Sequence, residues 1–310
     1  MNKMIATRDA FGDEILELGR VNDKLYIIDC DIGKSTKTAK FSTEFPQRHL
    51  NVGIAEQNAA GVAAGLSTMG MLPIISTYAV FGSMRMCEQV RTSICYPNLN
   101  VKIVCSHGGL TPGNDGATHQ GIEDIGIYRS IPNMAVIMPA DYHSARKLVR
   151  KMIDYNGPVY LRLTRDPIPV FYREDEDFEI GKGKRIREGK DISIITLGDM
   201  LHQALDASKH LIEMGIDVEI IDMHTVKPLD IGLIKQTIQK TGRVITVEDH
   251  NVLNGLGSAV AEIMAETGEG GVLRRIGLKD RFGESGDYYK LLEKYEMDSS
   301  SIIKATKKIL

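Results

Sequence analysis

Short, continuously apolar runs alternate with longer helical patterns along the whole chain, and this alternation limits the possible folds more than any other feature. The runs lack the polar alternate positions of a half-exposed strand, which is typical of strands buried on both faces of a parallel sheet. One helical pattern, at residues 141–155, has apolar side chains every three or four positions and begins with a capping residue, Asp141. The sequence therefore predicts an α/β fold of mostly parallel sheets with helices on both faces. The expected strands are residues 25–30, 72–77, 101–106, 134–139, 159–164, 192–198, 217–222, 243–249 and 271–277.

A charged segment that contains three glycines, residues 173–190, divides the alternation into two halves. This composition is typical of a linker or of an edge hairpin. A chain of 310 residues also exceeds the usual size of a single domain. We therefore expect a first domain at residues 1–175, a linker at 176–190 and a second domain at 191–310.

The composition excludes several classes of protein. The formal net charge of −3 gives no net basic field for nucleic acid or anionic lipid. No apolar run reaches the roughly 18 residues of a membrane-spanning helix, and a secretory signal would not contain Asp9, Asp13 and Glu14. The four cysteines show neither CxxC spacing nor a zinc-like pairing with histidine. We therefore expect a cytoplasmic protein with reduced thiols that contacts neither nucleic acid nor membrane.

One helical pattern, NVGIAEQNAAGVAAGLSTMG at residues 51–70, combines small side chains with a carboxylate near its start and carries no positive charge. Its alanines favour a helix that begins at Ala55 or Glu56. Gly61 and Gly65 each weaken a helix by about 1 kcal/mol, so close packing against another helix is expected to compensate. A first-turn glutamate is often only a capping residue. The other interpretation is a ligand that requires a buried carboxylate.

A glycine-rich loop, SHGGLTPGNDGATHQG at residues 106–121, follows one of the expected strands. Such a loop needs a ligand or a neighbour to hold a single conformation. Metal binding is the first alternative, but His107 and His119 stand twelve positions apart, which matches no standard ligand spacing. We therefore expect no metal ligands in this chain.

Together these segments resemble a transketolase. The chain is similar to the pyrimidine-binding and C-terminal domains of that family from ATRDAFG near its start to EDHNVLNGLGSAVAE at 248–262. The combination of GIAEQN with NDGATHQ is specific, and we find no Gly-Asp-Gly motif followed by asparagine, which the family uses for metal and diphosphate. The resemblance therefore implies one subunit of a split transketolase. The stretches that carry it are residues 52–70, 76–84, 106–141 and 161–169.

The resemblance implies thiamine diphosphate as the cofactor and the transfer of a two-carbon ketol unit from a ketose phosphate to an aldose phosphate. Mg²⁺, or another divalent ion, would be bound mainly by a separate N-terminal subunit of roughly 270 residues. The implied assembly is a heterotetramer with two copies of each subunit.

The resemblance also assigns the cofactor contacts. Glu56 would hydrogen-bond the aminopyrimidine ring and help the cofactor to lose its thiazolium proton, in an apolar surround suited to that proton exchange. Tyr78 and Phe81 would hold the aminopyrimidine by stacking, and Asp31 would lie beside the cofactor. A third aromatic position of the family is Met84 here, which departs from the family pattern.

The remaining assignments concern the sugar. His119 would donate to the substrate carbonyl oxygen as charge develops there, so it is expected to be catalytic together with Glu56. Asp115 would accept from a substrate hydroxyl, and His107 would lie near the hydroxyls or the phosphate.

The phosphate of the sugar has its own expected binding residues. The resemblance implies that Arg165, Arg8 and Ser35 bind it. Arginine suits this role because a guanidinium can bond phosphate bidentately and does not deprotonate.

Several alternatives remain. The beta subunit of a 2-oxo acid dehydrogenase shares the two-domain plan but lacks the DGATHQ pattern, and a deoxyxylulose phosphate synthase keeps that pattern but is normally one long chain. A non-catalytic partner module is a further alternative, against which the intact Glu56 and Arg165 argue. LNGLGSAV at residues 253–260 has only part of a dinucleotide fingerprint, so we interpret it as a helix-starting turn.

Overall fold

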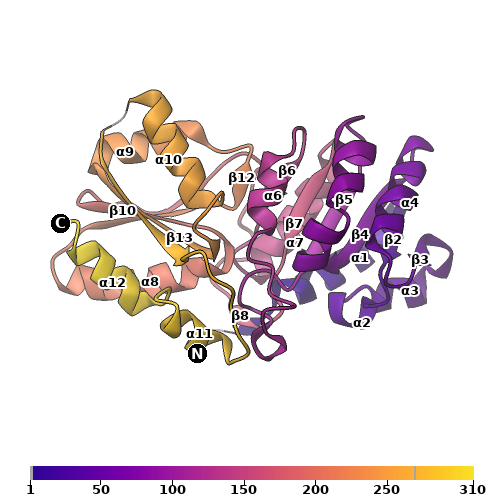
Figure 1. The fold of residues 1–310 in the computed structure, drawn as a ribbon, viewed down its shortest axis with the longest axis horizontal. Helices are drawn as coiled ribbons and strands as arrows, with labels where there is room; N and C mark the ends of the chain where they lie inside the picture. The colour runs from indigo at the N-terminus through magenta and orange to yellow at the C-terminus, as the bar shows by residue number, and fades with distance from the viewer. Residues whose placement is uncertain (1–2, 269) are drawn as a thin grey trace.

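The computed structural model describes residues 3–268 and 270–310, in which two β-sheets lie side by side (Figure 1). The first sheet has the strand order β12-β6-β7-β5-β4-β2-β3, with β12 antiparallel to β6 and the other neighbours parallel. Its strands are β2 (Leu25–Asp29), β3 (His49–Asn51), β4 (Leu72–Tyr78), β5 (Lys102–Ser106), β6 (Ala135–Ile137), β7 (Val159–Arg162) and β12 (Thr225–Lys227).

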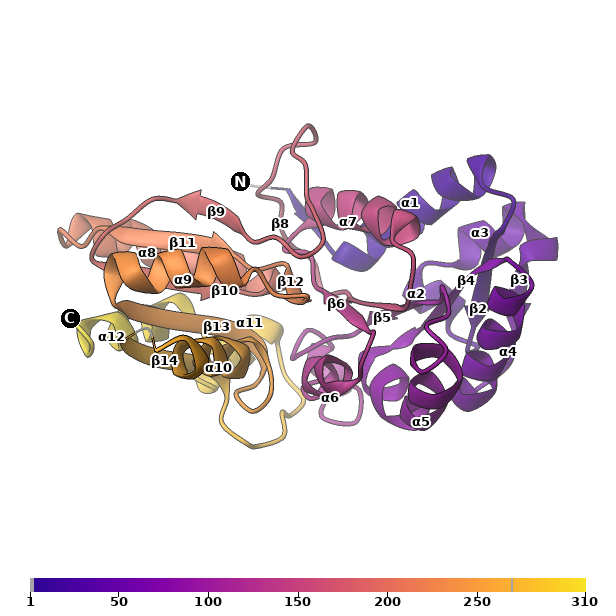
Figure 2. The same cartoon turned by 90° about the horizontal axis from the view of Figure 1, so that it is seen from above.

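Helices cover both faces of this sheet (Figure 2). Helix α7 begins after Asp141 as predicted, because Asp141 and Ser144 form a reciprocal capping box. One face carries α1 (Thr7–Val21), α3 (Ala39–Glu44) and α7 (Tyr142–Asp154), and the other carries α4 (Glu56–Thr68), α5 (Cys87–Gln89) and α6 (Asp124–Ser130). Two π-helical turns, Phe81–Arg85 and Val90–Cys95, flank α5.

The second sheet has the order β14-β13-β10-β11-β9, with β9 antiparallel to β11. Its strands are β9 (Lys184–Arg187), β10 (Ile192–Thr196), β11 (Val218–Asp222), β13 (Arg243–Asn251) and β14 (Val272–Leu278). Its helices are α8 (Leu201–Glu213), α11 (Tyr288–Lys294) and α12 (Ser299–Lys307) on one face, and α9 (Ile231–Thr241) and α10 (Leu256–Thr267) on the other.

The remaining elements are short. β1 (Met4–Ile5) pairs with β8 (Ile168–Pro169), and α2 (Gly33–Thr36) follows β2. Single 3₁₀ turns lie at Pro46–Arg48, Gly113–Asp115 and Gly198–Met200.

The predicted α/β class and all the expected strands are confirmed, but the two halves are less separate than the charge pattern suggested. Strand β9 lies inside the segment 176–190, which was expected to be a linker, and forms an edge of the second sheet. Strand β12 comes from the second half of the chain yet pairs with β6 in the first sheet. By covering the outer edge of β6, β12 satisfies backbone groups that would otherwise be unpaired.

No helix in the described part of the chain is both long enough and apolar enough to span a membrane.

Candidate active site

The carboxyl ends of four neighbouring strands bring most of the predicted residues to one edge of the first sheet. Tyr78 ends β4, His107 follows β5, Arg165 follows β7 and Asp31 follows β2. These strands lie in the order β7-β5-β4-β2, so residues that are far apart in sequence become neighbours. This edge is where open parallel sheets bind ligands.

Glu56 is the first residue of α4, as predicted, and its side chain is almost fully buried. Both carboxylate oxygens accept from Nη1 of Arg85, at 3.0 and 2.9 Å. Within the described residues, no backbone N–H of α4 donates to this carboxylate, so capping does not explain its position. The run at residues 51–70 carries no positive charge, but the structure brings a cation to this carboxylate from a residue 29 positions further along the chain.

Arg85 is the residue that the sequence analysis missed. Its guanidinium carbon lies 4.3 Å from the centroid of the Phe81 ring. The available signal was the spacing of four between Phe81 and Arg85 in a helical segment, which places two side chains on one face.

The aromatic side chains form a continuous cluster. Tyr78 stacks on His107, with ring centroids 3.7 Å apart and an interplanar angle of 26°. Phe81 stacks more loosely on Tyr78 at 5.7 Å and meets the edge of His119 at 5.6 Å. The cluster therefore links the two predicted cofactor aromatics to both loop histidines.

His107 is held tightly. Its backbone has a φ of +65°, its side chain is buried, and its Nδ1 shares a hydrogen bond of 2.8 Å with the Ser106 hydroxyl. Burial, together with the positive charges of Arg8 and Arg165, lowers the pKa of His107 to about 2. His107 is therefore a neutral group that can donate or accept one hydrogen bond.

His119 is half-buried in the same loop. Its Nδ1 lies 2.9 Å from the Thr118 hydroxyl. This contact leaves Nε2 as the ring nitrogen available to a ligand.

The two predicted phosphate-binding arginines differ in their partners. Nη1 of Arg8 donates to the carbonyl oxygen and to the hydroxyl of Ser35, at 3.0 and 3.1 Å, so these two residues lie in contact. Nε of Arg8 is buried and has no hydrogen-bond partner among the described residues. Burial lowers the pKa of Arg8, and the nearby positive charge of Arg165 lowers it as well.

Arg165 contacts carboxylates instead. Its Nη1 donates to Asp166 at 2.6 Å, and its Nε lies 3.5 Å from Oδ2 of Asp115. The predicted hydroxyl acceptor Asp115 is thus an ion-pair partner of the predicted phosphate-binding arginine. Both side chains are about one third exposed, so a ligand can reach the pair.

Asp31 and Met84 lie at the margin of this arrangement. Asp31 has a φ of +66°, is exposed and accepts from Nδ2 of Asn51 at 3.0 Å. It lines a groove of about 410 Å³ together with Ser35 and His49. Met84 is 45% exposed. Because methionine has no ring, it adds no third aromatic side chain beside Tyr78 and Phe81.

The donor set at this edge suits the aminopyrimidine half of thiamine diphosphate. A buried carboxylate can accept from a ring nitrogen, and the neighbouring aromatic ring offers a face for stacking. Within residues 3–268 and 270–310, no group of three histidine, cysteine, aspartate or glutamate side chains is arranged to hold a metal ion.

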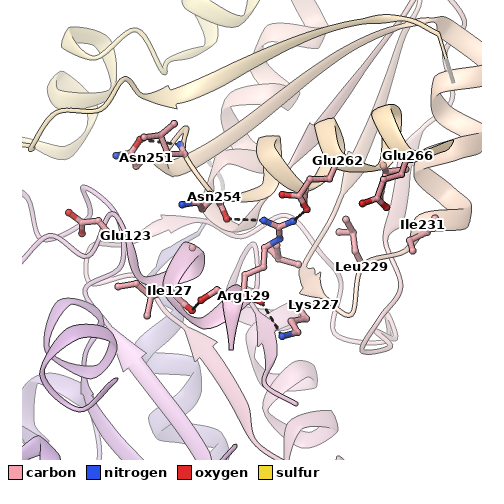
Figure 3. A pocket seen from close by; sticks show the side chains of 16 residues that line it. Glu123, Ile127, Arg129, Lys227, Leu229, Ile231, Asn251, Asn254, Glu262 and Glu266 are labelled. Carbon is pink, nitrogen blue, oxygen red and sulfur yellow. Dashed lines mark hydrogen bonds and ion pairs between the residues drawn. The ribbon is translucent and has the colours of Figure 1, made fainter. Parts of the chain in front are cut away.

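A larger groove, of about 810 Å³, lies between α6 of the first half and α10 of the second (Figure 3). It is lined by Arg129, Lys227 and Glu262, and none of the predicted site residues borders it. Arg129 pairs with Glu262 and donates to the carbonyl oxygen of Asn254, and Lys227 donates to the carbonyl oxygen of Arg129. These contacts join the two halves, so the groove lies at the interface between them.

The N-terminus of α10, which follows β13, is bonded by a side chain of the same chain. Glu248 accepts from the backbone N–H of Leu256 at 2.7 Å and of Gly257 at 2.8 Å. The interpretation of residues 253–260 as a helix-starting turn is confirmed, because this carboxylate occupies the place where a phosphate would bind.

The sequence matches two protein-family models, the transketolase pyrimidine binding domain over residues 3–169 and the transketolase C-terminal domain over residues 181–302. It is 46% identical over 299 residues to a protein described as a transketolase C-terminal section from Methanocaldococcus jannaschii, covering 96% of this chain and 94% of that one. It is 39% identical to the 6-deoxy-6-sulfo-D-fructose transketolase subunit SqwH of Clostridium sp. strain MSTE9, covering 97% and 94%. Among solved structures, a split gene transketolase in an inactive beta4 tetramer superposes with a TM-score of 0.92 at 46% identity, covering 99% and 98%.

Proposed function

The chain belongs to the transketolase family, and we propose that it is the C-terminal subunit of a split, thiamine-diphosphate-dependent transketolase. In this proposal it transfers a two-carbon ketol unit from a ketose phosphate to an aldose phosphate. The observation that carries the proposal is the grouping of a buried carboxylate, stacked aromatics and two arginines at one edge of the first sheet. The site divides into a pyrimidine end at Glu56 and an anion end at Arg8.

At the pyrimidine end, Glu56 accepts from a ring nitrogen of the aminopyrimidine and holds a proton there, while the Phe81 ring supports the ring face. Tyr78 keeps Phe81 in place through their stacked contact. When bound, thiamine diphosphate supplies the nucleophilic carbon that accepts the ketol unit.

The sugar lies over the loop that carries both histidines. His119 has Nε2 free to donate to the substrate carbonyl oxygen, where negative charge develops. His107 is neutral and oriented by Ser106, so it can bond a substrate hydroxyl without a competing charge. Asp115 accepts from a hydroxyl once the substrate draws Arg165 away from it.

At the anion end, Arg8 and Arg165 hold the terminal phosphate, and Ser35 orients Arg8. Two neighbouring guanidiniums repel each other, so a dianion between them is favoured. The relative that acts on 6-deoxy-6-sulfo-D-fructose also takes a sugar with a terminal anion, which supports an anion-binding role for this end.

The partner in this proposal is an N-terminal subunit that binds the diphosphate and Mg²⁺, in a heterotetramer with two of each subunit. Gly61 and Gly65 lie on the exposed face of α4, where an added Cβ would contact nothing within 4 Å. We assign this face to the assembly, which would supply the close packing that the sequence predicted. The cytoplasm suits the four free cysteines, because it keeps thiols reduced.

The test is reconstitution. The purified chain alone should have no ketol-transfer activity, and addition of the N-terminal subunit, thiamine diphosphate and Mg²⁺ should restore it. Replacement of Gly61 or Gly65 by leucine should prevent assembly in sedimentation experiments. Robust turnover by the single chain would refute the division of the site between two subunits.

A further inference from the structure

Arg85 makes two contacts that coincide with the two contacts expected of an aminopyrimidine. Its Nη1 donates to both oxygens of Glu56, and its guanidinium carbon lies over the Phe81 ring, 4.3 Å from the ring centroid. The carboxylate and the ring face are therefore both engaged by one side chain.

A guanidinium resembles a protonated aminopyrimidine in the properties that matter at this site. Both groups are planar and delocalised, both present N–H donors to a carboxylate, and both stack on an aromatic ring. A side chain with this chemistry can take the place of the cofactor ring without leaving Glu56 buried and unpaired, which would be costly.

We propose that Arg85 is a placeholder for the aminopyrimidine, and that cofactor binding must displace it from Glu56 and Phe81. This inference rests on the proposed function, since it assigns the pyrimidine end of the site to the cofactor. Arg85 is then a residue that sets cofactor affinity, and it keeps the catalytic carboxylate paired until the cofactor arrives.

The burial of the two partners shows which one moves. The Glu56 side chain is 2% exposed, whereas that of Arg85 is 43% exposed. Glu56 is fixed at the start of α4, and Arg85 can rotate into solvent by turning about its flexible side-chain bonds. Displacement therefore breaks one ion pair and leaves the carboxylate in place to accept from the cofactor.

The experiment measures the dissociation constant of thiamine diphosphate for the complex of this chain with its N-terminal partner, by calorimetry at fixed Mg²⁺. Arg85→Met should bind the cofactor about 10-fold more tightly, because no ion pair has to be broken and Glu56 lacks a competing donor. Arg91→Met is the matched control, since Arg91 is exposed six positions further on and its guanidinium has no ion pair in the described part of the chain. This control should leave the constant unchanged.

A double-mutant cycle separates competition from a general structural effect. In a Glu56→Gln background the ion pair is absent, so Arg85→Met should change the dissociation constant by less than about twofold. Arg85→Gln provides a second variant with a polar stem if Arg85→Met fails to assemble, and it should also tighten binding.

Two results would overturn the proposal. Unchanged or weaker cofactor binding in both Arg85 variants would mean that the arginine does not compete with the cofactor. A wild-type complex that binds no thiamine diphosphate would refute the proposed function itself, and the role of Arg85 with it.

Discussion

Near the carboxyl ends of their parallel strands, the two halves of this chain carry ionisable side chains that have different kinds of partner. In the second half, Asp222 at the end of β11 accepts from the Tyr172 hydroxyl at 2.7 Å, and Glu248 in β13 accepts from two backbone N–H groups. These carboxylates are fully buried. In the first half, Arg85 and Arg165 are 43% and 33% exposed, and they pair with the carboxylates of Glu56 and Asp115.

Under the proposed function, this difference explains why the site lies at the edge of the first sheet. A strand-end group fixed by rigid internal donors stabilises the fold but offers nothing to a ligand. A strand-end group paired with a flexible, partly exposed partner can exchange that partner for a ligand.

Asp222 gives the strongest test of the second sheet, whose strand-end carboxylates are buried and bonded within the chain; we call this the closed edge, and the corresponding edge of the first sheet the open edge. Burial raises the pKa of Asp222 to about 7, so the folded chain keeps a proton that the unfolded chain releases above about pH 4. The stability from this group is complete below about pH 4 and is lost as the pH rises through about 7. A shift of this size corresponds to about 4 kcal/mol over that window. Asp222→Asn should remove this pH dependence.

Urea denaturation between pH 4 and pH 8 measures this change. The wild-type midpoint should fall more steeply with rising pH than the Asp222→Asn midpoint. Parallel curves for the two proteins would show that the buried carboxyl of Asp222 is not responsible for the pH dependence of stability.

The strongest test of the open edge is Glu56→Gln. Glutamine can still hydrogen-bond the aminopyrimidine but cannot hold and release its proton. Turnover should fall about 100-fold or more, the range for loss of an acid–base group, while cofactor still binds. Exposed Glu88 is a suitable control, and Glu88→Gln should leave turnover unchanged. An active Glu56→Gln enzyme would return Glu56 to a structural role.

Arg165 tests the anion end. A charge-assisted bond to phosphate contributes about 1.5–3 kcal/mol, so Arg165→Ala should weaken productive binding of phosphorylated sugars by about 10- to 150-fold. The effect should lie mainly in KM, since the phosphate is remote from the reacting carbons. An unphosphorylated aldose acceptor of similar length should be nearly unaffected. Equal losses of productive binding for both acceptors would show that Arg165 has a structural role and does not bind the phosphate.

The smallest effect concerns the exposed face of α4 in the first half and a helix end in the second half. Gly65 lies inside α4 with free space around it, so Gly65→Ala should stabilise the isolated chain by roughly 0.5–1 kcal/mol. Gly242 ends α9 with a φ of +63°, so Gly242→Ala should destabilise the chain by about 1 kcal/mol. Thermal unfolding of both variants measures the opposite signs. A loss of stability in Gly65→Ala would show that this face is packed within the chain.

Much of the local structure followed from the sequence. The apolar runs predicted the strands, Asp141 predicted the start of α7, and the alanine-rich stretch predicted a helix that begins at Ala55 or Glu56. These features depend on residues within a few positions of each other, so spacing and side-chain type are sufficient to predict them. The position of β12 was not predicted, because its pairing with β6 joins segments about ninety residues apart.

The sequence by itself determined which side chains this chain offers for chemistry: a helix-start carboxylate, two histidines in a glycine-rich loop and the arginines. Only the tertiary structure decided their partners. Glu56 meets Arg85 across 29 positions and Arg8 meets Ser35 across 27. The physical reason is that an ionisable group in a partly dry environment takes the nearest opposite charge or hydrogen-bond partner, and strand order decides which group is nearest. The periodicity and spacing of residues along the chain do not reveal the order of the strands in the sheet.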